Sequence, residues 1–253
     1  MTNDIAIEVR GFSQYFGEVR KLNALGLDIR RNEILGIIGP ARSGKSTFLC
    51  ALNRLNDLVR GSRHEGTIRL DGCDIYAPDV DVVALRRKLG MVFATPVPLP
   101  RSIFENVAFG ARRAGIRGRD RLDALVWDSL EKGGLWEEVK DRLMTSGLKL
   151  SGGQQQRLCL ARILAVQPEF ILLDEPTSGL DPISTMKIED SLRRLKKDYT
   201  IILVTNNTKQ AARVADRTAF FLSGELVEVG PTAKIFTAPD DKRTDDYLRG
   251  RFG

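Results

Sequence analysis

Residues 39–47 read GPARSGKST and match the pattern G-x-x-x-x-G-K-S/T. A mostly apolar run at residues 33–38 precedes them, and a helical pattern of apolar residues at 45–56 follows. Between a strand and a helix, such glycines let backbone N–H groups surround phosphate oxygens, and the helix N-terminus favours the anion. A glycine-rich turn without a ligand would need neither the lysine nor the hydroxyl group. The stretch therefore predicts a site for the phosphates of a nucleotide.

The residues of this loop have predicted roles. Lys45 can reach the β- and γ-phosphates and act in catalysis, and the hydroxyl of Ser46 can bind Mg²⁺. All are candidate nucleotide ligands: Gly39, Pro40, Ala41, Arg42, Ser43, Gly44, Lys45, Ser46 and Thr47.

A second segment, FILLDEP at residues 170–176, places two acidic side chains at the end of an apolar strand pattern. Ligands of α/β proteins bind at the carboxyl ends of strands. We expect Asp174 to help hold Mg²⁺ and Glu175 to polarise an attacking water. Alone, the two acids could equally cap the next helix; the phosphate loop upstream favours the catalytic interpretation.

A third segment, LSGGQQQR at residues 150–157, precedes an amphipathic helical pattern. A hydroxyl and two glycines at a helix N-terminus favour anion binding, although an ordinary helix capped by Ser151 would have the same string. Because the chain already contains a phosphate loop, we expect this second element to serve a nucleotide held by another copy.

Strand and helix patterns alternate along the chain, except after ATPVPLP at residues 94–100, where only helical patterns occur up to residue 166. This predicts an α/β fold: a phosphate-loop NTPase core with a mostly parallel sheet, an N-terminal antiparallel β part and an inserted α-helical subdomain. We expect one nucleotide-binding domain over residues 1–253. Its parts are a core at 1–94 and 166–230, a helical insertion at 95–165 and a C-terminal tail at 231–253. Strands are expected at 5–10, 33–38, 66–70, 89–93, 170–173, 200–204, 218–222 and 226–229, and helices at 45–56, 80–88 and 182–196.

Composition excludes several classes of protein. With 42% hydrophobic and 28% charged residues, the 253-residue chain is typical of globular proteins rather than of disordered or fibrous ones. No apolar window reaches the roughly 18–20 residues of a membrane helix, and no signal sequence is present, which predicts a cytoplasmic protein. Cys50, Cys73 and Cys159 lack metal-ligand spacing, and His64 is the only histidine. The net charge of +6 includes no basic run with interleaved aromatics, so no nucleic-acid partner is expected.

The order GPARSGKST, LSGGQQQR, FILLDEP and SGLDP (residues 178–182) resembles the ATP-binding subunits of ABC transporters, over the whole chain. Residues 157–182 and the C-terminal FTAPDDKRTDDYLRGRFG at 236–253 most resemble the ATPases of phosphate importers. The resemblance implies an ATPase that drives transport, with ATP and Mg²⁺ bound. It implies as partners two integral membrane permease subunits and, through them, a phosphate-binding protein, with the chain peripheral on the inner face of the cell membrane.

The resemblance also implies a head-to-tail homodimer that encloses two ATP molecules. Each site would join the phosphate loop of one subunit to the LSGGQ of the other, and Asp181 would cross the interface. In QYFG at residues 14–17, Phe16 is the candidate for stacking on adenine, with Tyr15 as the alternative and core packing as the competing explanation. The nucleotide contacts implied beyond the phosphate loop are Phe16, Ser151, Gly152, Gly153, Gln154 and Asp181.

Two positions depart from the family pattern. Ala94 in MVFATP stands where the family has a glutamine, and Asn206 in LVTNN stands where it has a histidine. The amide of Asn206 can still donate a hydrogen bond to the γ-phosphate, but it carries no charge. No glutamine lies between Gln14 and Gln154, and we expect His64 in a surface loop, so neither role is replaced from nearby sequence.

These departures predict near-normal MgATP binding with slow hydrolysis, in which the catalytic residues are Glu175, Lys45 and Asn206. The alternative is a regulatory or degenerate module that binds ATP with little turnover. A DNA-repair or chromosome-organising ATPase would need a long coiled coil before LSGGQ, and residues 48–149 contain no sustained heptads.

Overall fold

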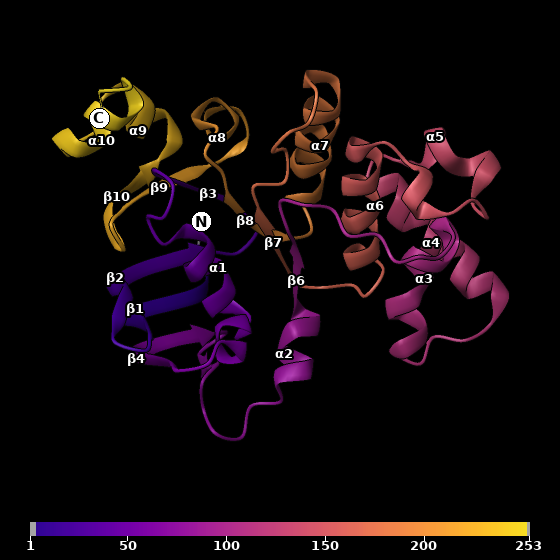
Figure 1. Ribbon diagram of the computed structural model, residues 1–253, viewed down its shortest axis with the longest axis horizontal. Coiled ribbons are helices and arrows are strands. Elements are labelled where there is room, and N and C mark those ends of the chain that lie inside the picture. The colour runs from indigo at the N-terminus through magenta and orange to yellow at the C-terminus, as the bar shows by residue number, and fades with distance from the viewer. Residues whose placement is uncertain (1–3, 252–253) are drawn as a thin grey trace.

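The computed structural model describes residues 4–251, which form two β-sheets and a separate group of helices (Figure 1). Residues 1–3 of the expected core and 252–253 of the expected tail lie outside the described residues. The larger sheet has the order β10-β9-β3-β8-β7-β6, in which all neighbours are parallel except β10 and β9. Its strands are β3 (Ile34–Ile38), β6 (Leu89–Val92), β7 (Phe170–Asp174), β8 (Thr200–Val204), β9 (Arg217–Leu222) and β10 (Glu225–Pro231).

The central strands of this sheet are continuous apolar runs. Every residue of β3 and β8 is buried, as is every residue of β7 except Asp174. Such runs belong to parallel strands covered on both faces. One face of the sheet packs Leu35 and Ile37 against Phe48, whereas the other places Ile34 among apolar residues of the helices behind it.

The smaller sheet is antiparallel and has the order β2-β1-β4-β5. Its strands are β1 (Ile5–Phe16), β2 (Val19–Arg30), β4 (Ser62–Leu70) and β5 (Cys73–Asp74). The expected strand at 5–10 was too short, because a register shift between Val9 and Phe12 interrupts the alternation. At this point a Cβ on Gly66 would lie 2.3 Å from the carbonyl oxygen of Gly11, so the two backbones approach closely.

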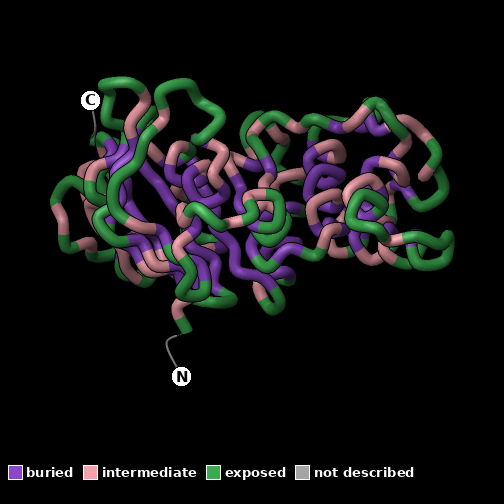
Figure 2. The backbone as a smooth tube through the Cα atoms, turned by 90° about the horizontal axis from the view of Figure 1, so that it is seen from below, coloured by how far each residue is buried: buried purple, intermediate pink, exposed green. Residues whose placement is uncertain are grey.

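Between β6 and β7 the chain forms helices with a core of their own. They are α3 (Ile103–Arg113), α4 (Arg119–Lys132), α5 (Trp136–Val139) and α6 (Gly152–Leu164), with 3-10 turns η2 (Lys140–Arg142) and η3 (Gly147–Lys149). Buried Val107, Val126, Leu130 and Leu158 hold them together. Figure 2 shows this second buried region apart from the one in the sheets. We call residues 103–164 the helical segment; the exact limits 95–165 of the insertion stay a prediction.

The remaining helices lie on the sheets. They are α1 (Lys45–Leu52), η1 (Leu55–Leu58), α2 (Val82–Lys88), α7 (Pro182–Leu195), α8 (Thr208–Val214), α9 (Thr232–Thr237) and α10 (Lys242–Leu248). The helix expected at 45–56 ends at Leu52, since Arg54 has a left-handed backbone with φ of 57°. In the polar tail, Phe236, Tyr247 and Leu248 pack on buried Phe220 of β9.

Candidate functional site

The phosphate loop connects β3 to α1 and depends on two glycines. Gly39 has φ of 148°, and a Cβ there would lie 2.0 Å from the carbonyl oxygen of Phe221. Gly44 has φ of 100°, and its Cβ would lie 2.7 Å from a methyl of Leu22. A side chain at Gly39 would collide with backbone, and a side chain at Gly44 would have to adopt a strained positive φ and displace the Leu22 side chain. The loop borders a hollow of about 230 Å³ lined by Lys21, Arg42, Ser43, Gly44, Lys45, Ser46 and Thr47.

Lys45 is held inside this loop. Its side chain is 5% exposed, and Nζ donates 2.8 Å hydrogen bonds to the carbonyl oxygens of Gly39 and Pro40. Burial lowers the pKa of Lys45, while the carboxylates of Glu175 and Asp174 oppose this shift. An ammonium group has three donors, so Lys45 can bind a phosphate oxygen while keeping both carbonyl contacts.

Ser46 and Asp174 meet although they are far apart in the chain. Ser46 Oγ donates a 2.9 Å hydrogen bond to Asp174 Oδ1, which joins the start of α1 to the end of β7. Burial raises the pKa of Asp174, and the Ser46 hydrogen bond and the Lys45 charge counteract it. A hydroxyl and a carboxylate are oxygen ligands suited to Mg²⁺, which usually takes few protein ligands and completes its shell with waters and phosphates. Within residues 4–251 no group of three or more His, Cys, Asp or Glu side chains that could hold a metal ion occurs.

Glu175 follows Asp174 in an unusual backbone conformation, with φ of 51°. Its N–H donates to the carbonyl of Val204 at 2.9 Å, and its Oε2 accepts a hydrogen bond from the backbone N–H of Asn206 at 3.1 Å. Burial raises the pKa of Glu175, opposed by the Asn206 hydrogen bond and by Lys45. The ends of β7 and β8 thus place a carboxylate with raised proton affinity beside the phosphate loop.

The LSGGQ segment begins α6, as expected. Ser151 is its N-cap, and a capping box joins Ser151 and Gln154: the Gln154 N–H donates to Ser151 Oγ, and the Ser151 N–H to Gln154 Oε1. Gly152 is exposed beside Ser151. Figure 1 shows α6 and α1 on opposite sides of β6 and β7, so the two glycine-rich elements lie apart within one chain.

The segment SGLDP lies beside the LSGGQ segment. Asp181 is the N-cap of α7, where its carboxylate accepts hydrogen bonds from the backbone N–H and the hydroxyl of Ser184, at 2.9 and 2.6 Å. A Cβ on Gly153 would lie only 2.3 Å from Ser184 Oγ, so the starts of α6 and α7 pack directly on each other.

The aromatic candidates and the histidine lie in the antiparallel sheet. Phe16 is half-buried at the end of β1, and the structure leaves its contact with adenine a prediction. Tyr15 donates to Glu65 at 3.1 Å, and the guanidinium of Arg63 lies 3.6 Å from its ring centroid. The expectation that His64 occupies a surface loop is right in its exposure and wrong in its secondary structure: His64 lies in β4, and its ring is tilted by 31° to that of Tyr76 with the centroids 3.8 Å apart.

Ala94 lies in the loop that follows β6, as the sequence indicates. The carbonyl of Phe93, just before it, accepts a 2.8 Å hydrogen bond from Gln156 Nε2 of α6. Arg162 of α6 likewise donates to a backbone carbonyl of this loop, that of Val97 at 2.9 Å, and Ala94 adds no polar group.

Two contacts of the phosphate loop were not expected from the sequence. Buried Asn56 donates to the carbonyl of Thr47 at 2.9 Å and to Gln14 of β1 at 3.2 Å. Tyr247 of α10 forms a hydrogen bond with the backbone of Gly39, and burial raises the pKa of its hydroxyl. An aromatic in the polar tail was the sole sequence signal for the second contact.

The fold and this site define a phosphate-loop nucleotide-binding protein, and the predicted α/β fold class is confirmed. The family model described as ABC transporter matches residues 22–178. The chain therefore belongs to the ABC transporter family and is an ATP-binding subunit of that class. Among residues 4–251, no helix is long and apolar enough to cross a membrane.

Two solved structures are similar over the whole chain. The first is cbiO1 from Clostridium perfringens, part of the ABC transporter complex cbiONQ, with 24% identity and a TM-score of 0.82 over 98% of this chain and 97% of that one. The second is a bacterial Atm1-family ABC exporter with ATP bound, with 27% identity and a TM-score of 0.80 over 100% of this chain and 43% of the exporter. At 24% sequence identity, the comparison with cbiO1 shows a shared fold.

Proposed function

We propose that this chain hydrolyses ATP to power import through an ABC transporter, and that the imported substrate is inorganic phosphate. The observation that carries the ATPase proposal is the Ser46 to Asp174 hydrogen bond beside Lys45 and Glu175. A hydroxyl and carboxylate pair suited to Mg²⁺, a cation and a candidate base lie at the same edge of the sheet, which supports the proposal.

In the proposed mechanism each residue acts on the terminal phosphate. Lys45 and the loop N–H groups would bind the β- and γ-phosphates, and Ser46 and Asp174 would hold Mg²⁺, which would supply positive charge there. Glu175 orients a water and accepts its proton while the water oxygen attacks the γ-phosphorus and the bond to ADP breaks. Asn206 holds Glu175 through its backbone and offers its side-chain amide to the phosphate.

We infer a head-to-tail homodimer for the working enzyme. Ser151 and Gly152 are exposed at the start of α6, which lies apart from the phosphate loop of the same chain. A second copy would bring its Ser151, Gly153, Gln154 and Asp181 to the nucleotide. This assignment follows the family resemblance of LSGGQ and SGLDP.

The choice of phosphate rests on residues 157–182 and 236–253, which resemble phosphate-importer ATPases. On this proposal the chain is peripheral on the inner face of the cell membrane, bound to two permease subunits that receive phosphate from a binding protein. A regulatory subunit with little hydrolysis is the second candidate, favoured by Ala94 and Asn206.

Co-purification with membrane partners, followed by reconstitution, tests these proposals. Vesicles that enclose this chain and MgATP, with the binding protein outside, should take up phosphate and not sulfate, and Lys45→Ala should abolish uptake. Uptake of another substrate would reject phosphate import while retaining the ATPase. ATP binding without hydrolysis, with and without the partners, would favour the regulatory subunit.

A further inference from the structure

A buried charge on α6 depends on one carboxylate of the helical segment. Arg157 is 2% exposed, and its guanidinium donates to both oxygens of Glu138, at 2.7 and 3.1 Å, and to the carbonyl of Gly134 at 2.6 Å. A buried charge is tolerated only when it is paired and hydrogen-bonded. Glu138 therefore neutralises the α6 guanidinium.

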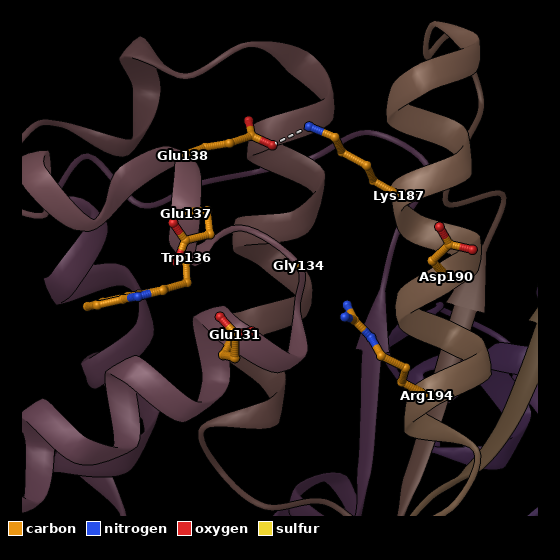
Figure 3. Close-up of a pocket in the computed structure, with 8 residues that line it drawn as sticks. All are labelled: Glu131, Gly134, Trp136, Glu137, Glu138, Lys187, Asp190 and Arg194. Atoms are coloured by element: carbon orange, nitrogen blue, oxygen red, sulfur yellow. Dashed lines mark hydrogen bonds and ion pairs between the residues drawn. The ribbon is translucent and has the colours of Figure 1, made fainter.

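Glu138 also contacts two residues that have no part in this neutralisation. Gln154 Nε2 donates to Glu138 Oε2 at 2.8 Å, and Lys187 Nζ donates to Oε1 at 2.6 Å. Figure 3 shows Glu138 and Lys187 reaching toward each other between the helical segment and α7. The Arg157 hydrogen bond, followed by those of Lys187 and Gln154, lowers the pKa of Glu138 to about 2, so the carboxylate stays charged.

Two partners of Glu138, Gln154 and Lys187, lie in the first two turns of two different helices. Gln154 forms the capping box with Ser151 at the start of α6. Lys187 lies in α7, whose N-cap is Asp181. One carboxylate is thus bonded both to the side chain that caps the LSGGQ helix and to the helix that carries Asp181.

We propose that Glu138 is a positioning residue that, through Lys187, holds Ser151 and Gln154 in a fixed place relative to Asp181. The proposal rests on the proposed function in one respect: the starts of α6 and α7 are the parts proposed to contact the nucleotide bound by a second copy of the chain. The alternative is that Glu138 serves only to neutralise Arg157, with Lys187 a passive surface cation.

Lys187→Met separates the two explanations, since it removes the link to α7 and leaves the Glu138 contacts with Arg157 and Gln154. Lys187 is 44% exposed beside a hollow of about 340 Å³, so the fold should tolerate the change. A matched control is Lys140→Met. Lys140 pairs with Glu137 at the same 2.6 Å and is 41% exposed, but that pair is local to α5 and η2.

Hydrogen exchange on the full-length chain gives a readout that does not need ATPase activity. We expect Lys187→Met to speed exchange of the amides at 154–155 and 184–185 by about fivefold or more, because these N–H groups donate to Ser151 and Asp181 at the two helix starts. Amides of the phosphate loop should be unchanged, Lys140→Met should match the parent chain, and Lys187→Arg should restore the parent rates. Equal exchange in Lys187→Met and Lys140→Met would overturn the proposal.

Steady-state kinetics adds a second measure. Lys187→Met should lower kcat by about 3- to 10-fold with little change in KM for ATP, since each chain's own phosphate loop is intact. Lys140→Met should change neither value. If the parent chain hydrolyses no ATP, the proposed function fails, while the exchange comparison still decides the role of Glu138.

Discussion

The backbone N–H of Asn206 donates a hydrogen bond of 3.1 Å to the carboxylate of Glu175. Because the donor is the main chain, this contact is available to any residue at position 206 that keeps the local backbone. The orientation of Glu175 is therefore separated from the side chain that approaches the γ-phosphate. Substitution at 206 can alter the stabilisation of charge while leaving the candidate base in place.

This separation predicts that Ala94→Gln combined with Asn206→His raises turnover. Each new hydrogen bond to a charged group contributes about 1.5–3 kcal/mol, which corresponds to about 10- to 150-fold in rate if it acts only in the transition state. Both side chains would act on one phosphate, so their effects should not simply add. Steady-state ATPase assays at saturating MgATP would measure the gain, and an unchanged kcat in the double variant would contradict the prediction.

Glu175→Gln should greatly lower turnover and stabilise the fold at neutral pH. Loss of a general base lowers the rate by about 10²- to 10⁴-fold. Burial raises the pKa of Glu175, so the folded state holds this proton more tightly than the unfolded state, and stability falls as pH rises above the unfolded value of about 4.3. The uncharged amide of the Gln variant does not titrate, so its free energy of unfolding should not fall in this way as the pH rises.

Urea unfolding of Glu175→Gln and the parent at pH 4 and pH 7 would measure the difference, which should be larger at pH 7. Glu169→Gln is the control, because Glu169 forms an exposed ion pair with Lys88 at 3.2 Å. Destabilisation of Glu175→Gln at pH 7 would show that burial of its charge is not costly.

Glu138→Gln should show the opposite dependence on pH. Its folded pKa of about 2 is depressed, so the carboxylate contributes stability that is present above the unfolded value of about 4.3 and is lost as pH falls through about 2. We expect Glu138→Gln to lower the free energy of unfolding by about 1–3 kcal/mol at pH 7, and by less near pH 3. The low end of this range is expected because Glu138 is 27% exposed.

Denaturant unfolding across this pH range measures the effect of Glu138→Gln, with Glu137→Gln as the neighbouring control. Glu137 is 73% exposed and pairs only with Lys140 among the ion pairs described, so its variant should remain close to the parent. Similar losses in both variants would reject the special role of Glu138 in stability.

Phe16→Ala should weaken ATP binding. Stacking of a base on an aromatic side chain contributes about 1–3 kcal/mol, equivalent to about 5- to 150-fold in Kd. Tyr15→Ala is the control, since the Tyr15 ring already contacts Arg63 and its hydroxyl bonds Glu65. Calorimetric titration with ATP would compare the two, and a larger effect of Tyr15→Ala would assign the stacking role to that residue instead.

The parts of the fold that short stretches encode were predictable. Apolar runs identified β3, β7 and β8, because strands covered on both faces need no alternation. The strand β2 was missed, although its second half alternates between buried Leu25, Leu27 and Ile29 and more exposed residues. Its first three residues are exposed and two of them are charged, so the alternation of apolar and polar residues is not apparent over the whole strand.

In the site, too, contacts between residues close in sequence were predictable, whereas contacts between distant segments were not. Lys45 and the carbonyls of Gly39 and Pro40 are close in sequence, so one motif predicts their contact. The contacts of Glu138 with Lys187 and of Tyr247 with Gly39 join segments far apart in the chain. Such contacts depend on how layers pack, which no local pattern in a single sequence reports.

The missing side chain of Gly153 has a mechanical consequence. A methyl group there would stand 2.3 Å from Ser184 Oγ and 2.6 Å from Ser184 Cβ, closer than atoms can approach without displacement. Because Gly153 carries only hydrogen at this point, the first turns of α6 and α7 can pack closely against each other. We therefore expect a displacement of the turn that carries Ser151 to be passed on to the turn that carries Asp181.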